Sequence, residues 1–167
     1  MVKNLGKSFR SGTVKKSVTI NVSKQKVWKE ISNIVGLPLW LVDVRETIFL
    51  SKKKRGVGAI RLIIFNDRKT IEEHVVDWKN EECFTYIATE GLPLRAYVAT
   101  LKINPKSKNT SILTWQSYFN SKKMTKKEFL DFQKTLEQFY ESSLKNLKKR
   151  LEKNPTKCKY NEIDLRL

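Results

Sequence analysis

Residues 125–153 read TKKEFLDFQKTLEQFYESSLKNLKKRLEK, and this stretch decides the fold. Side chains that can face a core recur there every three or four residues, the spacing of one face of an α-helix. The stripe consists of Phe129, Phe132, Leu136, Phe139, Ser143 and Leu147, and is widened by Tyr140, Leu144 and Leu151. Thr125 can cap the start of the helix. At ~1.5 Å per residue the helix is around 40 Å long, so its apolar face needs a broad surface to pack on.

The stretch before this helix supplies such a surface, because its apolar residues alternate with a period of two. We predict strands at 47–51, 58–65, 68–77, 83–90, 94–104 and 111–120. The turns between them are short and polar, so successive strands should pair antiparallel as a meander. A further strand is predicted at 15–22, followed by a helix at 24–34 and a short second helix or turn at 39–42.

The predicted element order is β-α-α-β-β-β-β-β-β-α, which is an α+β arrangement. It favours a curved antiparallel sheet of about seven strands around the long C-terminal helix. The length of 167 residues fits one domain, which we place at 15–153. Residues 1–14 are polar and basic and are expected to form a flexible arm, and residues 154–167 a C-terminal tail.

Composition argues against several functional classes. The chain has one histidine, His74, and two distant cysteines, Cys83 and Cys158, so we expect no metal site and no disulfide framework. It has no phosphate-binding loop and no dinucleotide glycine fingerprint, so we expect no cofactor. Because neither a secretory signal nor an apolar run of about 20 residues is found, we expect a cytoplasmic protein.

Several short strings, taken in order, resemble the START-like helix-grip superfamily (SRPBCC), in its polyketide cyclase/dehydrase and lipid-transport branch. The strings are Val27-Trp28, Pro38-Leu39-Trp40, residues 56–61 (GVGAIR), residues 71–78 (IEEHVVDW), residues 91–94 (GLPL) and Thr114-Trp115. The resemblance covers about residues 15 to 153. It implies a helix-grip fold with a cavity between sheet and helix, in which the positions of Arg61 and Glu73 line the pocket.

In the hairpin of residues 59–77, the alternation of side chains along each strand also predicts that Arg61 and Glu73 lie close together on one face. With a connection of three residues, 67–69, Phe65 would face Ile71 and Ile63 would face Glu73. Arg61 and Glu73 would then be diagonal neighbours on the face that packs on the helix. Two interpretations remain open: a structural ion pair, or a polar patch in an apolar pocket that orients a ligand.

The predicted ligand-binding set contains residues from the sheet and from the helix. Its members are Arg61, Ile63, Phe65, Ile71, Glu73, Val75, Tyr86, Tyr97, Phe132, Leu136, Phe139 and Ser143. Ala88, Ala99 and Leu101 are expected to add to the lining, and Trp40 either covers one end of the cavity or caps the core. The parity of strand 111–120 leaves open whether Trp115 and Phe119 point inward or outward.

Three functional hypotheses follow. The first is binding or transport of a small hydrophobic molecule or lipid in the cavity. The second is a cyclase or aromatase, in which Glu73 acts as acid/base and Arg61 holds an enolate. The neighbouring arginine is expected to lower the pKa of Glu73, which makes the carboxylate a weaker base near neutral pH. The third is binding of nucleic acid or an anionic membrane, because the net charge is +17 and cations cluster at Lys52-Lys53-Lys54-Arg55.

Overall fold

A single antiparallel sheet forms the frame of the molecule. The computed structural model describes residues 9–153. Seven strands are hydrogen-bonded in the order β1-β7-β6-β5-β4-β3-β2. The strands are β1 (Arg10–Ile20), β2 (Val44–Phe49), β3 (Ile60–Phe65), β4 (Thr70–Lys79), β5 (Cys83–Glu90), β6 (Ala96–Ser107) and β7 (Thr110–Ser121). The helices are α1 (Lys24–Ile31), the short 3-10 helix η1 (Leu37–Leu39) and α2 (Lys126–Glu152).

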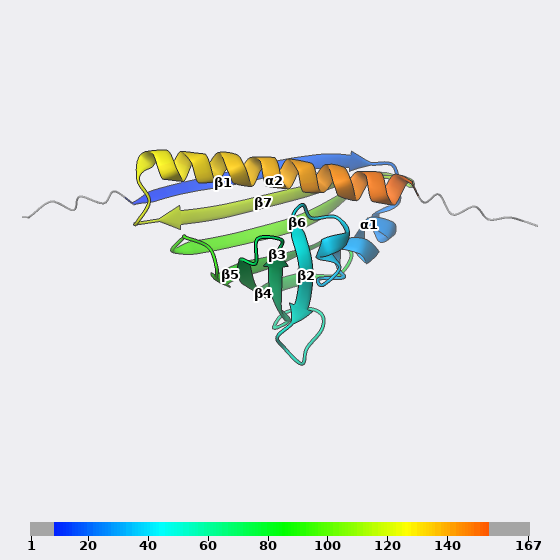
Figure 1. Ribbon diagram of the computed structural model, residues 1–167. Helices are drawn as coiled ribbons and strands as arrows, with labels where there is room; N and C mark the ends of the chain where they lie inside the picture. Colours follow the sequence, from blue (N-terminus) through cyan, green and yellow to red (C-terminus); the bar gives the residue numbers. More distant parts are fainter. Residues whose placement is uncertain (1–8, 154–167) are drawn as a thin grey trace, which may run out of the picture.

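The long helix α2 lies along the concave side of the sheet, over β1 and β7, while β2 to β5 curve away below it (Figure 1). A capping box fixes its start: Thr125 accepts a hydrogen bond from the Glu128 backbone, and the Glu128 carboxylate accepts one from the Thr125 backbone. The buried face is the predicted stripe, including Tyr140, Leu144 and Leu147. The predicted helix-grip architecture is therefore confirmed.

The first strand is longer than expected. It begins at Arg10 and pairs with β7 from Arg10↔Ser121 to Ile20↔Ser111. Residues 10–14, which we assigned to the arm, therefore belong to the sheet, and Val14 is buried within it. The sequence pattern did not indicate a strand here, because Val14 is the only large apolar residue among residues 10–14. Residues 1–8 of the predicted arm and the predicted tail 154–167 lie outside the described residues.

The segment between β1 and β2 is less helical than predicted. Helix α1 ends at Ile31, three residues earlier than expected. The short helix or turn expected at 39–42 is a single 3-10 turn that lies two residues earlier, at Leu37–Leu39, with Pro38 near its start. This turn places Leu37, Trp40 and Leu41 in the core.

The inward face of β7 is also now defined. Trp115 and Phe119 are buried, whereas Tyr118 is 41% exposed on the outer face. The concave side of the sheet is therefore strongly aromatic, and it forms one wall of the site described next.

Candidate functional site

The β3–β4 hairpin places Arg61 directly opposite Glu73. Our register, with Ile63 opposite Glu73, is wrong by two residues, because Ile63 pairs with Ile71 instead. The turn encloses residues 66–68 rather than 67–69: the Phe65 N–H donates to the Lys69 carbonyl at 2.9 Å. A shift of two preserves parity, so the prediction that both charges share the inward face holds.

Arg61 and Glu73 form a buried ion pair. Glu73 Oε2 lies 2.8 Å from Arg61 Nε and 2.6 Å from its second terminal nitrogen, Nη2. Arg61 Nη1 donates to the Ile34 carbonyl at 2.9 Å, and the guanidinium lies 4.9 Å from the centre of the Tyr86 ring. The side chains are only 3% and 7% exposed. A buried charge without a partner costs several kcal/mol, on the order of 3–5, so each member of this pair requires the other.

The pKa of Glu73 is raised, whereas we expected it to be lowered. Burial raises it above the ordinary value, and the charge and hydrogen bonds of Arg61 offset that effect only in part. The expected lowering considered the arginine alone and left out the desolvation of a buried carboxyl group. Glu73 is thus a carboxyl group whose ionised state depends strongly on Arg61.

An aromatic hydrogen-bond network adjoins the ion pair. Trp115 Nε1 donates to the Tyr86 hydroxyl at 3.0 Å, and the Tyr97 and Tyr140 hydroxyls are hydrogen-bonded to each other. The rings of Trp115 and Tyr140 stack 3.8 Å apart and nearly parallel. Burial raises the pKa of all three tyrosines, so these hydroxyls stay protonated at neutral pH.

A cavity lies between this network, helix α2 and the β3–β4 hairpin. Its volume is about 50 Å³. Nine of the predicted ligand-binding residues line it: Arg61, Ile63, Phe65, Ile71, Glu73, Tyr86, Tyr97, Leu136 and Phe139. Their role in ligand binding remains a prediction, since their position on the wall does not identify an occupant.

Three residues of the predicted set lie elsewhere. Val75 is buried in β4 but outside the cavity wall. Phe132 packs on Phe119, with ring centres 5.6 Å apart, near the start of α2. Ser143 accepts a hydrogen bond from the Val42 N–H at 3.3 Å, which ties α2 to the segment after η1. Helical and strand periodicity selected the correct faces, but it could not give the position of the cavity along them.

Six wall residues lie outside the predicted set: Leu37, Trp40, Leu41, Leu92, Leu101 and Trp115. Leu101 was expected as additional lining, whereas Ala88 and Ala99, expected with it, are not on the wall. The sequence does not settle the positions of Trp40 and Trp115. Leu37 to Leu41 reach the cavity through the η1 turn, which has no amphipathic period to identify it. Leu92 belongs to the β5–β6 loop. A sequence signal was available for Trp115, because a buried indole N–H usually has a hydrogen-bond acceptor and this favours a position beside other polar groups.

One polar atom on the cavity wall, Trp40 Nε1, is buried and unpaired. Both contacts of Arg61 with Glu73 end on Glu73 Oε2, so the ion pair does not supply this atom with a partner. Trp40 is 2% exposed, and its Nε1–H has no acceptor within residues 9–153. Trp28 Nε1 is likewise unpaired, but Trp28 packs on Trp78 away from the cavity wall. An unpaired donor, the Trp40 indole N–H, thus borders the cavity.

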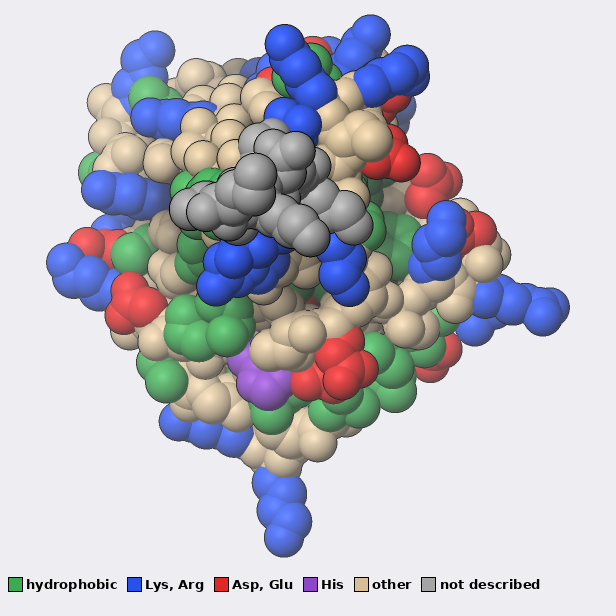
Figure 2. All heavy atoms as spheres, turned by 90° about the vertical axis from the view of Figure 1, so that its left-hand side faces the viewer, with side chains coloured by type: hydrophobic (Ala, Val, Ile, Leu, Met, Phe, Trp, Pro, Cys, Tyr) green, Lys and Arg blue, Asp and Glu red, His purple; other side chains and the backbone are tan. Residues whose placement is uncertain are grey.

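The single histidine takes no part in this cavity. His74 contacts a Glu72 oxygen at 2.6 Å, and Thr89 donates to the same oxygen at 3.0 Å. Figure 2 shows the histidine beside acidic side chains on the outer surface. Within the part of the chain that the structure describes, no group of three His, Cys, Asp or Glu residues is placed to hold a metal ion.

Fold and site together define a helix-grip protein with an internal cavity, a ligand-binding architecture. The chain belongs to the family described as polyketide cyclase / dehydrase and lipid transport, whose family model matches residues 11–152. None of the curated proteins compared gives a significant match.

Solved structures share the fold at low sequence identity. An uncharacterised protein from Bacillus thuringiensis is 23% identical with a TM-score of 0.71, covering 84% of this chain and 99% of that one. The protein XoxI from Bacillus cereus is 23% identical with a TM-score of 0.72, covering 84% and 96%. Norcoclaurine synthase from Thalictrum flavum, solved with dopamine and hydroxybenzaldehyde, is 17% identical with a TM-score of 0.69, covering 90% and 91%.

Proposed function

We propose that the protein binds a small hydrophobic molecule with one polar end in the cavity between α2 and the β3–β4 hairpin. The observation that carries the proposal is the unpaired Trp40 Nε1–H on a largely apolar cavity wall that also holds the Arg61–Glu73 ion pair. A buried polar group without a partner costs about 1–3 kcal/mol, so a ligand that supplies an acceptor to this donor recovers this energy. Apolar contacts with the aromatic walls supply the remaining affinity.

Binding requires the cavity to enlarge. A volume of about 50 Å³ accommodates a few water molecules but not a ring system. The wall residues best able to move are only partly buried and come from different elements. They are Phe65, Ile71, Leu92, Leu136 and Phe139. Rotation of these side chains enlarges the space on one side, while the ion pair and the tyrosines stay fixed.

Native mass spectrometry tests the proposal. The purified protein is mixed with an organic extract of cells, and we expect one bound molecule per chain that is released on denaturation. Ile63 lines the cavity, whereas Ile64 faces the opposite side of β3. Replacing Ile63→Phe fills the space and should reduce the bound fraction at least ~10-fold, a loss of about 1.4 kcal/mol in affinity.

The matched control is Ile64→Phe, which adds the same ring on the other face and should bind as the unmodified chain does. Two results would contradict the proposal. One is a chain that carries no bound molecule after exposure to the extract. The other is equal loss of the bound molecule in both variants, which would mean that a bulky residue in β3 acts through the fold and not through the cavity.

A second candidate function is a cyclase or dehydrase acting on polyketide-like substrates, with Glu73 as acid/base. The raised pKa of this buried carboxyl favours it, because an acid/base group works best with a pKa near the working pH. The products separate the two functions. Cyclisation with dehydration lowers the mass of an added polyketone by one water, and cyclisation alone gives an isomer of the same mass with a changed chromatographic retention, whereas a carrier returns the polyketone unchanged.

A further inference from the structure

The connection between β2 and β3 combines positive charge with exposed apolar side chains. Residues 50–58 read LSKKKRGVG and contain four cations and no acid. Leu50 and Val57, which flank the cations, are each 48% exposed. Val76 is 42% exposed and lies beside the base of this segment, since Val75 exchanges backbone hydrogen bonds with Gly58 and Ala59. We refer to residues 50–58 as the basic tip.

The basic tip is internally bonded. The Ser51 hydroxyl donates to the Lys53 carbonyl at 2.6 Å and accepts from the Ile60 N–H at 2.8 Å. Gly56 and Gly58 adopt positive φ angles of 78° and 89°, which reverse the chain after the cations. The tip is therefore presented in a defined shape.

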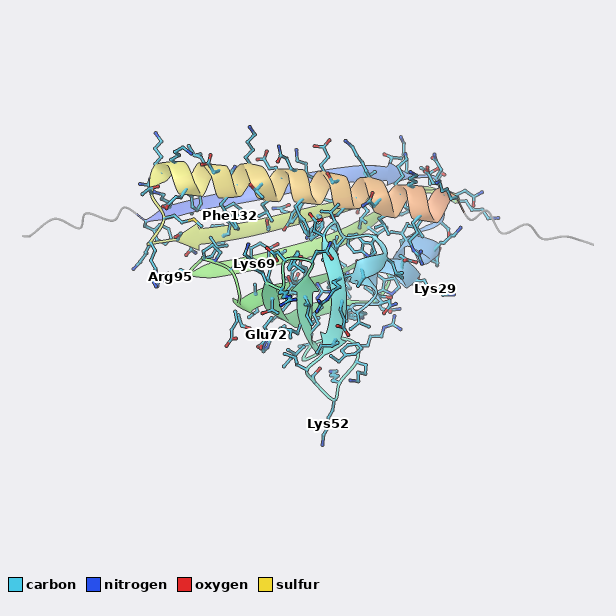
Figure 3. The ribbon with its side chains drawn as sticks, in the orientation of Figure 1. Lys29, Lys52, Lys69, Glu72, Arg95 and Phe132 are labelled. Carbon is cyan, nitrogen blue, oxygen red and sulfur yellow. The ribbon has the colours of Figure 1, made fainter. Side chains whose placement is uncertain are left out.

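The basic tip also protrudes from the molecule. It extends below the sheet in Figure 1, and Lys52 marks its far end in Figure 3. In Figure 2 a Lys or Arg side chain forms the lowest point of the molecule. A protruding segment of this kind can meet a flat surface without obstruction from the sheet or from α2.

We infer that the basic tip docks the protein on an anionic lipid bilayer, with Leu50 and Val57 entering the interface and Lys52 and Lys53 contacting the headgroups. Clustered lysines next to a membrane surface are attracted by its negative potential. Apolar side chains at the same point enter the acyl boundary, as in interfacial segments generally. Nucleic acid offers the same negative charge but no reason to expose Leu50 and Val57 among the cations.

The bilayer proposal also agrees with the rest of the chain. No helix within residues 9–153 is long and apolar enough to cross a membrane, so contact through the tip would be peripheral. The proposal is independent of the ligand in the cavity, because the tip contributes no residue to the cavity wall.

Sedimentation with vesicles tests the inference. The probe is phosphatidylcholine vesicles with about 30 mol % phosphatidylserine, a composition that carries a strong negative surface potential. The variant Lys52→Gln/Lys53→Gln/Lys54→Gln should bind on the order of 100-fold more weakly. The variant Leu50→Ser/Val57→Ser keeps every charge and should bind on the order of 10-fold more weakly.

The β6–β7 turn offers a matched control, because Lys106 and Lys108 are exposed there without apolar neighbours between Pro105 and Asn109. Lys106→Gln/Lys108→Gln should bind nearly as well as the unmodified chain. Loss of binding in this control equal to that of the lysine variant would overturn the inference in favour of general charge attraction. Binding to duplex DNA that depends on the tip lysines but is unchanged by Leu50→Ser/Val57→Ser would overturn it in favour of nucleic acid.

Discussion

Replacing Arg61 with methionine is expected to lower the free energy of unfolding by about 3–5 kcal/mol, the usual cost of removing one partner of a buried ion pair. Arg61 provides both contacts to Glu73 Oε2 and a hydrogen bond to the Ile34 carbonyl. In Arg61→Met the carboxylate stays enclosed with no cation, and the carbonyl loses its donor. Urea denaturation followed by circular dichroism measures the change.

A double variant separates the lost pair from simple loss of packing. In Arg61→Met/Glu73→Leu no charge remains in the site, so we expect most of the lost stability to return. Recovery should be incomplete, because the Ile34 carbonyl is still without its donor. A double variant as unstable as Arg61→Met would mean that the pair does not govern stability here.

The cost of Arg61→Met should depend on pH. Burial raises the pKa of Glu73, and removing Arg61 removes the influences that lower it. A group whose folded-state pKa lies above its unfolded value of 4.5 destabilises the fold as pH rises through the folded pKa. We therefore expect a smaller loss at about pH 5 than at about pH 8, because the carboxyl is more often protonated at the lower pH. A loss that grows toward acid pH would contradict this sign.

The second large effect is expected from Gly91→Ala, at the start of the β5–β6 loop that carries Leu92 to the cavity. Gly91 has a φ of +91°, and a Cβ atom there would lie 1.9 Å from the Thr70 carbonyl oxygen. The obstacle is backbone, so either the loop or β4 must shift. We expect a loss of at least about 3 kcal/mol, from left-handed strain and the clash together.

Gly56→Ala provides the control for this prediction. Gly56 also has a positive φ, +78°, but a Cβ atom there would meet only the flexible Lys53 side chain at 3.9 Å. Its cost should be about 1–2 kcal/mol, from backbone strain alone. Equal losses in the two alanine variants, measured by urea denaturation, would show that the approach of Gly91 to Thr70 is not a constraint on the fold.

Periodicity alone predicted most of the fold. The α2 stripe and the alternation of the six later strands are strong signals, because each element buries one face along its whole length. The predicted first strand is too short and the predicted helix or turn is two residues late, because neither element depends on an apolar period. The start of β1 is held by pairing with β7, and η1 is set by Pro38 and by packing of Leu37.

The sequence predicted which faces of the strands and of α2 form the site, but it did not predict every residue that lines the cavity. Strand parity placed Arg61 and Glu73 on the inward side even though the register was wrong by two residues. Trp40, Leu41 and Leu92 come from non-repeating segments, and their approach to the cavity depends on tertiary packing. The direction of the Glu73 pKa shift likewise depends on how deeply the carboxyl group is buried in the folded chain, which no local sequence pattern reports.

The central claim is that the cavity beside Arg61 and Glu73 binds a small molecule with an apolar body and a polar end. The four tryptophans provide the most direct test. Trp40 and Trp115 line the cavity, whereas Trp28 and Trp78 pack on each other with ring centres 5.1 Å apart. Titration with p-cresol, a small phenol, is followed through the indole N–H signals in a nitrogen-15 NMR spectrum.

We predict saturable shifts of the Trp40 and Trp115 signals, with those of Trp28 and Trp78 nearly unchanged. Trp40 should move most, because its N–H gains an acceptor in the phenol oxygen. Signals of all four tryptophans that stay fixed up to the solubility limit of p-cresol, or that move together without saturation, would contradict the claim.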